Sequence, residues 1–233
     1  MEIGGTVVSS LEYSGKMSLV IFMAKCPLRC PYCHNSEILE GGEPTTLEEI
    51  FKIIDDSVDY IDAVVISGGE PLVQIDELLE ILKYSKSLGL KTKVDTSACY
   101  PKRLKKVLNY IDYLAIDVKA PFNRYKELTM FNIGNKVKNS IQIANDNKET
   151  FLECRTTYVP GLLDHEDIKQ IANEISCDLY TLQQFRNKNV LDESLEDVKS
   201  PNPIELKILA NEIQPIINTK VKIKTAEFGE ECI

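Results

Sequence analysis

The chain has 233 residues, of which 43% are hydrophobic and 27% are charged, and its formal net charge is −9. This length and balance predict a globular protein with one domain over residues 1–233. The acidic excess argues against general binding to nucleic acid or anionic membranes, which depends on surplus lysine and arginine, and no apolar run approaches the ~18–20 residues of a membrane span.

Strands and helices are expected to alternate along the chain. The apolar runs interpreted as strands are, in chain order, residues 19–24, 63–66, 91–94, 113–116, 151–158 and 179–182, with 221–224 as an added strand. Helices are expected from Thr46, over 75–89, from Pro101, between 124 and 146, after Asp164 and over 203–214. Six βα units in alternation predict a parallel sheet with helices outside it. This pattern alone does not separate a doubly wound sheet from a barrel.

Three closely spaced cysteines follow the first expected strand. Cys26, Cys30 and Cys33 have the spacing C-x3-C-x2-C. A 4Fe–4S cluster normally takes one cysteine per iron, so three ligands would leave one iron open, and an open position is typical of catalytic metal sites. The alternative is a structural zinc site with His34 as fourth ligand. Zinc ligands usually form two pairs separated by a longer loop, however, and His34 directly follows Cys33.

Other unusual residues stand where strands are expected to end. Gly68-Gly69-Glu70-Pro71 follows the second strand, Asp95-Thr96 ends the third, and Asp117-Val118-Lys119 ends the fourth. In parallel α/β folds the functional groups gather at the C-terminal ends of the strands, and glycines let the backbone approach a ligand closely. The alternatives are a common turn for the glycines and a surface ion pair of little energetic consequence for the charged residues.

The compartment is inferred from the N-terminus and the cysteines. Residues 1–5 lack a basic segment followed by an apolar one, so no secretory signal is visible. Seven cysteines are an odd number with three crowded together, which favours reduced thiols over a disulfide framework. We therefore expect a cytoplasmic protein, and we interpret the scattered Cys99, Cys154, Cys177 and Cys232 as bystanders.

The cysteine run and its surroundings resemble the signature of radical S-adenosylmethionine (SAM) enzymes. The resemblance implies an open, partial (β/α)6 barrel with outer helices, one 4Fe–4S cluster on the three cysteines, and SAM chelated at the open iron. Tyr32 matches the aromatic residue usually found before the third cysteine, which places Tyr32, Cys33 and His34 beside SAM. Gly68, Gly69 and Glu70 look like the motif whose backbone holds the methionine amino group.

The strand ends more narrowly resemble those of glycyl-radical-enzyme activating proteins. In that family the aspartates, here Asp95 and Asp117, help hold a monovalent cation beside the SAM carboxylate, and the lysine contacts SAM. Arg155 matches an arginine that reaches SAM, although a strand arginine paired with a nearby acid is as good an interpretation. Gln184 stands where a residue meets the adenine, but this segment departs from the family's Pro-Tyr-His. The implied SAM-binding set here is Asp95, Thr96, Asp117, Val118, Lys119, Arg155 and Gln184.

Nearly the whole chain looks like the anaerobic ribonucleoside-triphosphate reductase activating proteins, from Ile3-Gly4-Gly5 to Phe228-Gly229-Glu230-Glu231. That resemblance implies an oxidoreductase that cleaves SAM reductively and generates a glycyl radical on a partner enzyme, with a flavodoxin- or ferredoxin-type electron donor. No catalytic residue beyond the cluster and the SAM site is expected. About 34 residues separate Cys33 from Gly68, too few for the two-cluster insert of some activators, so we expect a single cluster.

Two alternatives remain at this point. One is a radical SAM enzyme acting on a small heterocycle, of the deazaguanine synthase type, although the Asp-x-Lys and Val-Pro-Gly stretches favour an activator. The other is a non-enzymatic metal-binding module. For an activator the mouth of the barrel must admit a peptide, and we expect flexible ends at Gly4–Gly5 and Gly229–Cys232 to flank an open cleft.

Overall fold

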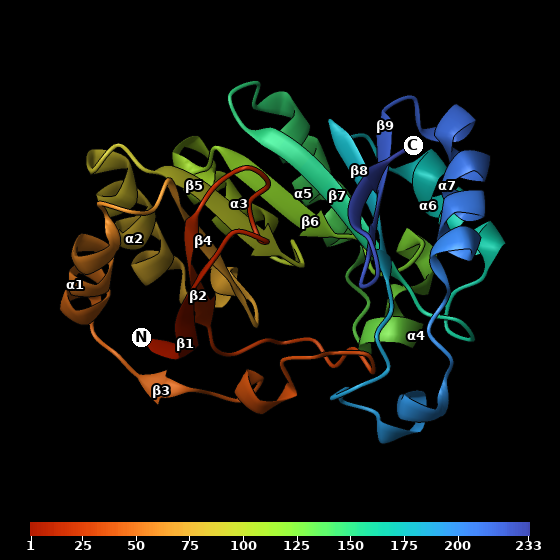
Figure 1. Cartoon of the computed structure of the whole chain (residues 1–233), viewed down its shortest axis with the longest axis horizontal. Coiled ribbons are helices and arrows are strands. Elements are labelled where there is room, and N and C mark those ends of the chain that lie inside the picture. The colour runs from red at the N-terminus through yellow and green to blue at the C-terminus, as the bar shows by residue number, and fades with distance from the viewer.

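The computed structural model describes residues 1–233 and is built around one ten-stranded sheet (Figure 1). Its strand order is β10-β9-β8-β7-β6-β5-β4-β2-β1-β3. The seven consecutive strands from β2 to β9 in this order pair in parallel. They are β2 (Ser18–Met23), β4 (Ala63–Gly68), β5 (Lys91–Thr96), β6 (Tyr113–Asp117), β7 (Phe151–Tyr158), β8 (Leu179–Gln184) and β9 (Lys220–Thr225).

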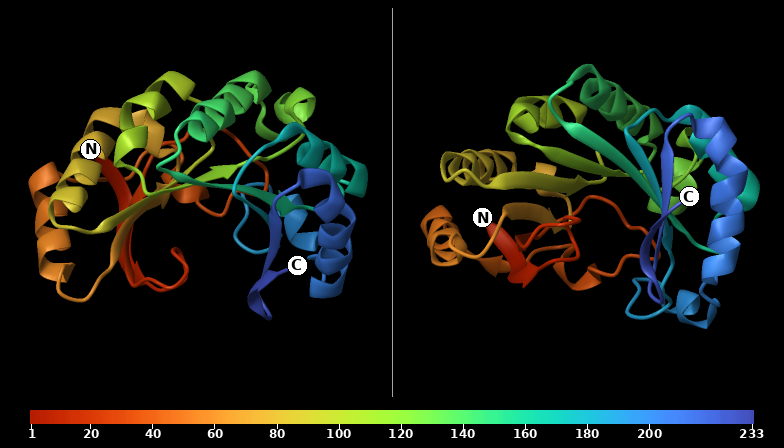
Figure 2. Two further views of the ribbon diagram at one scale, coloured as in Figure 1. Left: turned by 90° about the horizontal axis from the view of Figure 1, so that it is seen from above. Right: turned by 45° about the horizontal axis from the view of Figure 1, so that its top comes forward.

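The helices connect the parallel strands and cover the convex face of the sheet, as Figure 2 shows. They are α1 (Leu47–Ser57), α2 (Ile75–Ser87), α3 (Pro101–Val107), α4 (Tyr125–Thr129), α5 (Gly134–Asp146), α6 (His165–Glu174) and α7 (Pro203–Ile217). The edge strands of the sheet do not pair with each other, so the curved sheet forms an open barrel. The predicted partial (β/α)6 barrel is confirmed.

Helix starts follow the capping signals in the sequence. Thr46 accepts a hydrogen bond from the Glu49 N–H, and the Glu49 side chain accepts one from the Thr46 N–H, which closes the predicted capping box of α1. Asp164 caps α6 in the same way with Asp167. Helix α7 runs three residues beyond its predicted end, because Pro215 lies inside it without ending it.

Three strands were not expected, and the prediction of flexible ends is wrong. Gly4–Gly5 lies in β1 (Glu2–Ser9), which pairs antiparallel with β2. Gly229–Cys232 is β10, which pairs antiparallel with β9, and the short β3 (Glu43–Pro44) pairs with β1. These strands are held by backbone hydrogen bonds and bury few side chains, so they leave little apolar pattern in the sequence.

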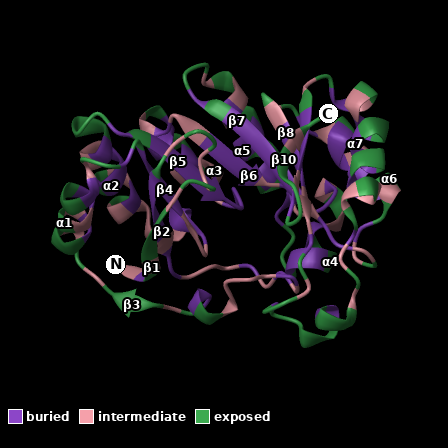
Figure 3. Ribbon diagram, in the orientation of Figure 1, coloured by how far each residue is buried: buried purple, intermediate pink, exposed green.

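The apolar core lies between the sheet and the helices, where buried residues follow the strands and the inner helix faces (Figure 3). In α2, for example, Leu78, Ile81 and Leu82 are fully buried at helical spacing. The concave face of the sheet carries polar side chains instead, among them Lys93, Asp95 and Arg155. No helix is both long and apolar enough to span a bilayer.

Candidate functional site

The cysteine loop crosses the C-terminal ends of the parallel strands, along the lower edge of Figure 1. It leaves β2 at Met23 and is folded back on itself, since the Cys26 N–H donates to the Leu39 carbonyl at 3.0 Å and the Cys33 N–H to the Cys30 carbonyl at 3.1 Å. All seven cysteines of the chain are free thiols. Cys30 is buried, while Cys26 and Cys33 are partly exposed.

A cavity of about 220 Å³ lies between this loop and the strand ends. It brings together most of the residues that the sequence indicated, which come from the loop after β2 and from the ends of β4, β5 and β6. Those that line it are Cys26, Cys30, Tyr32, Cys33, His34, Gly68, Gly69, Asp95, Thr96, Asp117 and Lys119. Glu70, Val118, Arg155 and Gln184 do not line it.

Two of the loop thiols, those of Cys26 and Cys30, are harder to ionise than a free cysteine. Burial raises the pKa of Cys26 to about 12 and also raises the pKa of Cys30, while the positive charge of Lys119 acts in the opposite direction on both. Only the thiolate binds a metal. Metal loading must therefore displace thiol protons, and Lys119 is the side chain that favours this step.

The geometry does not support a zinc site completed by His34. The His34 Nε2 atom lies 2.9 Å from the Arg186 carbonyl oxygen, on the loop after β8. No three His, Cys, Asp or Glu side chains of the chain converge on one point where a single metal ion would sit. Three free thiols around one cavity instead suit a cluster, in which each cysteine binds a different iron.

The two glycines are required by a close approach of chain segments. Gly68 has φ +108°, and a Cβ there would lie 2.5 Å from the Met23 carbonyl oxygen. A Cβ on Gly69 would lie 2.5 Å from the Lys25 carbonyl oxygen, to which the Glu70 N–H donates at 2.9 Å. Any side chain here would push the end of β4 away from the cysteine loop.

Glu70 does not line the cavity but joins two of the segments that do. Its carboxylate accepts hydrogen bonds from Thr96 Oγ1 at 2.6 Å, the Ser97 N–H at 2.8 Å and the Leu72 N–H at 3.0 Å. The side chain is fully buried, and burial raises its pKa against the opposing effect of these bonds. Glu70 therefore ties the loop after β4 to the end of β5.

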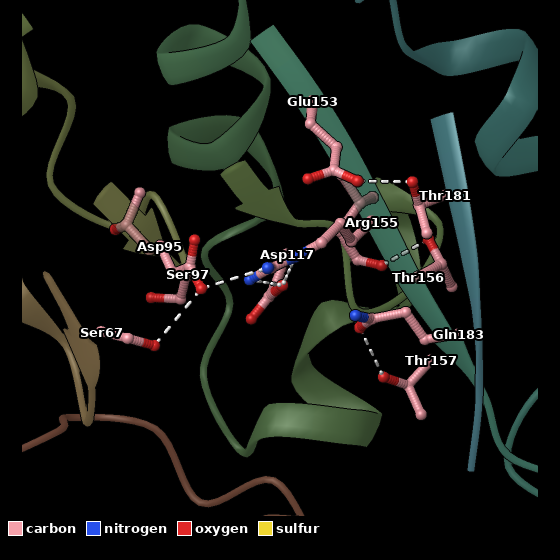
Figure 4. Close-up of polar contacts among 12 residues, drawn as sticks. Ser67, Asp95, Ser97, Asp117, Glu153, Arg155, Thr156, Thr157, Thr181 and Gln183 are labelled. Atoms are coloured by element: carbon pink, nitrogen blue, oxygen red, sulfur yellow. Dashed lines mark hydrogen bonds and ion pairs between the residues drawn. The ribbon is translucent and has the colours of Figure 1, made fainter. Parts of the chain in front are cut away.

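The charged strand ends form one network around Arg155 of β7, drawn in Figure 4. Arg155 Nε and Nη2 lie 2.9 and 2.8 Å from Asp117 Oδ1, and Nη1 lies 3.1 Å from Asp95 Oδ2. The Lys119 Nζ atom lies 3.5 Å from Asp117 Oδ2. Burial alone would raise the pKa of both aspartates, but the neighbouring cations outweigh it and hold both pKa values below the usual range.

Three of the residues indicated by the sequence take other positions. Arg155 pairs with the two acids, as the alternative interpretation held. Val118 is buried, and its N–H donates to the Arg155 carbonyl at 2.7 Å. Gln184 turns toward the loop after β9, where it accepts from the Ala226 N–H at 2.7 Å and donates to Glu227.

The set of site residues assigned from the sequence left out seven residues that line the cavity, namely Leu28, Asn35, Leu39, Ser67, Ser97, Thr157 and Gln183. Neighbouring side chains on a strand point to opposite faces. Since Gln184 points away from the cavity, Gln183 points into it, and Thr157 lies two residues beyond Arg155 on the same face of β7. The period of two was thus the signal that could have placed both.

Comparison with known proteins agrees with this arrangement. The family model described as "Radical SAM superfamily" matches residues 20–175, which include the cysteine loop and the ends of β4, β5 and β6. The chain belongs to the radical SAM superfamily. Membership implies a 4Fe–4S cluster and SAM, and three free thiols lining one cavity fit the cluster.

Relatives are found among activating enzymes of this superfamily. A protein of Methanocaldococcus jannaschii named "Putative glycyl-radical enzyme activating enzyme MJ1227" is 40% identical over 223 residues, covering 92% of each chain. A pyruvate formate-lyase-activating enzyme of Clostridium pasteurianum is 33% identical over 164 residues, covering 67% of this chain and 68% of that protein.

Solved structures share the fold. The crystal structure of Streptococcus suis SuiB bound to its precursor peptide SuiA superposes with a TM-score of 0.71 at 16% identity, covering 88% of this chain and 48% of that one. A domain of a pyruvate-formate lyase-activating enzyme from Bacteroides vulgatus gives a TM-score of 0.57 at 19% identity, covering 70% of this chain and 99% of that one.

Proposed function

We propose that residues 1–233 form one radical SAM domain that activates a glycyl-radical enzyme. The observation that carries the proposal is the combination of three free thiols with the charged ends of β5 and β6 around one cavity. The relative of Methanocaldococcus jannaschii, which matches over nearly the full length, supports the activating role.

When bound, the cluster and SAM supply a reductive cleavage whose radical product abstracts a hydrogen atom from a glycine. The chain's own residues bind, orient and exclude water. The backbone at Gly68–Gly69 and the Lys119 ammonium lie on the cavity wall where SAM would be held. Tyr32 is only 6% exposed and lines the cavity beside Cys33, where its ring would help to exclude water from the bound cofactors.

The partner that we propose is an anaerobic ribonucleotide reductase. Support for this choice comes from the stretches at both ends of the chain, which resemble activating proteins of that class and which form β1 and the β9–β10 hairpin. These stretches lie at the two sides of the open sheet, so they are placed where a large substrate could reach them (Figure 2).

For the electron donor we propose a flavodoxin- or ferredoxin-type protein that docks beside the cysteine loop. Two further loops are held against the cysteine loop, because the Arg29 N–H donates to the Thr129 carbonyl and the Asp192 N–H donates to the Pro31 carbonyl. These loops expose Met130, Phe131 and Leu191. Exposed apolar and aromatic side chains are typical of protein interfaces.

The test is to reconstitute the protein anaerobically with iron and sulfide, reduce it, and mix it with SAM and a co-encoded glycyl-radical enzyme. Electron paramagnetic resonance should then show the doublet of a backbone glycyl radical. A Cys30→Ala variant is the matched control and should give neither the radical nor SAM cleavage. Vigorous SAM cleavage without the doublet, together with turnover of a deazaguanine precursor, would replace this proposal with a small-heterocycle enzyme.

A further inference from the structure

A buried lysine that no motif indicated lies directly under the charged strand ends. Lys93 precedes Asp95 by two residues on β5, so both side chains point to the concave face of the sheet. Its side chain is 5% exposed, and its Nζ atom lies 3.2 Å from Asp95 Oδ1. Apart from this ion pair, Asp95 Oδ1 has no hydrogen-bond partner.

The position of the Lys93 ammonium is held by its surroundings. It donates a hydrogen bond to the backbone carbonyl of Glu12 in the β1–β2 loop. It lies 5.3 Å from the centre of the Tyr113 ring, a cation–π distance. Tyr13 packs edge-on against Tyr113 with 5.2 Å between ring centres. Lys93 is therefore a fixed charge and cannot swing away when a ligand enters the cavity above it.

With Lys93 included, every carboxylate oxygen of the aspartate pair faces a cationic nitrogen. Asp95 Oδ1 faces Lys93 and Asp95 Oδ2 faces Arg155, while Asp117 Oδ1 faces Arg155 and Asp117 Oδ2 faces Lys119. Two negative charges are thus matched by three positive ones. Since each of these oxygens already faces a cationic nitrogen of the chain, a further cation would find no carboxylate oxygen free to bind it.

The sequence-based expectation of a monovalent cation between Asp95 and Asp117 therefore does not fit this site. We propose that Lys93 supplies, as part of the chain, the positive charge that such a cation would bring, so that this protein binds SAM without one. The proposal rests on the proposed function only in taking the cavity as the SAM site. Lys93 is a positioning residue, since it acts on SAM through Asp95 and lies below the cavity.

The first test needs neither cluster nor SAM. Thermal unfolding of the isolated chain is followed at constant ionic strength in potassium, sodium or tetramethylammonium chloride. The native protein should show one melting temperature in all three salts. Lys93→Met exposes an unmatched Asp95 oxygen and should be selectively stabilised by potassium or sodium, because a ligand that binds only the folded state raises the melting temperature.

A control variant separates this effect from general loss of a buried charge. Lys222→Met removes another buried lysine of the concave face, one that pairs with Glu153 and Glu230 and does not touch Asp95. It should lose stability equally in all three salts. If Lys93→Met does not fold, Lys93→Gln is measured in its place. The melting temperatures of the native protein in the three salts also test the proposal on their own. Selective stabilisation of the native protein by potassium or sodium would overturn the proposal.

The second test measures SAM affinity of the reconstituted protein by calorimetry in the same salts. Native affinity should not depend on the cation. Lys93→Met should bind SAM about tenfold more weakly in tetramethylammonium and recover in potassium or sodium. Equal affinity of variant and native protein in tetramethylammonium would refute the role of Lys93. If the native protein bound no SAM at all, the proposed function would be contradicted. The melting temperatures would then still test whether a cation binds between Asp95 and Asp117.

Discussion

At the residue scale, the charge of Lys119 influences both the aspartate network and the cysteine thiols. Lys119 lies between two sets of acids, the Asp117 carboxylate on one side and the thiols of Cys26 and Cys30 on the other. Burial lowers the Lys119 pKa, but these neighbours more than offset it and the net shift is upward. The ammonium therefore stays charged at any working pH, and its loss should affect both SAM binding and the ease with which the thiols ionise.

We expect the three cysteines of the loop to be individually essential for the cluster. Alanine at Cys26, Cys30 or Cys33 removes one thiolate from a set that has no spare, so the iron content after reconstitution should fall to near zero. Alanine at Cys99 or Cys154, which are buried but do not line the cavity, should leave iron binding intact. A requirement for either of these two as strict as for the triad would contradict the assignment of an open iron.

Lys119→Met should weaken SAM binding by about 1.5–3 kcal/mol, the range for a lost charge-assisted hydrogen bond. Lys126→Met is the matched control, because Lys126 is exposed in the neighbouring α4 and forms no ion pair. Calorimetric titration of the reconstituted variants with SAM provides the measurement. If the Lys119→Met variant bound SAM with native affinity, Lys119 would not be the group that contacts the SAM carboxylate.

How far residues could be assigned from the sequence depended on which face of a strand they occupy. Motifs at strand ends were recognisable because cysteine and glycine spacings are rare. Lys93 was not recognisable in this way. Because the inner face of the barrel is itself polar, the stretch Lys91-Thr92-Lys93 has the same polar pattern as an exposed edge strand. Gln184 was chosen over Gln183 although the alternation of Tyr180 and Leu182 with Thr181 puts Gln183 on the polar inner face of β8 and Gln184 on the apolar outer face.

At the scale of elements, the βα units were predictable and the antiparallel additions were not. A parallel strand buried on both faces carries a continuous apolar run, such as Val64-Val65-Ile66 in β4. In β1 only Ile3 is buried, so that strand is defined by pairing with β2 and leaves no apolar period. The same holds for β10, where none of the four residues is buried.

At the N-terminal ends of β5 and β6, one carboxylate joins three elements. Asp112, which precedes β6, lies 2.9 Å from Lys86 of α2 and 3.0 Å from Lys91 of β5, and it accepts from the Thr92 N–H at 2.9 Å. Burial of the carboxylate would raise its pKa, but these partners lower it to about 2. Asp112 thus links α2, β5 and β6 at the end of the barrel opposite the cavity.

Asp112 should make stability fall in acid. Its pKa is lower in the folded chain than the ~3.9 of an unfolded aspartate, so its contribution is complete above about pH 4 and is lost as the pH falls toward 2. Asp112→Asn should lower the free energy of unfolding by on the order of 2 kcal/mol at pH 7. It should also make that free energy fall less steeply as the pH is lowered. Urea unfolding between pH 7 and 3 measures this, with the exposed Asp56→Asn as control. If the free energy of unfolding fell equally steeply in acid for Asp112→Asn and for the native chain, this prediction would be wrong.

At the scale of the whole molecule, the barrel is open on one side because the edge strands β3 and β10 do not pair. The β1–β2 loop and the turn of the β9–β10 hairpin lie at the two sides of this opening, as Figure 2 shows in its left view. The hairpin turn follows β9 at the end of the barrel where the cavity lies, and it exposes 72% of Phe228. A protein substrate approaching the cavity would meet this ring.

We therefore expect Phe228→Asp to impair activation of the partner while leaving the SAM site intact. Exposed aromatic side chains often dominate the energy of an interface, so the partner concentration that gives half-maximal glycyl radical should rise about tenfold or more. SAM cleavage without partner should be unchanged, because Phe228 does not line the cavity. Tyr60→Asp is the control, since Tyr60 is an exposed aromatic residue that precedes β4 at the opposite end of the barrel. Equal loss in both variants, or loss of partner-independent cleavage in Phe228→Asp, would show that the hairpin is not the docking edge.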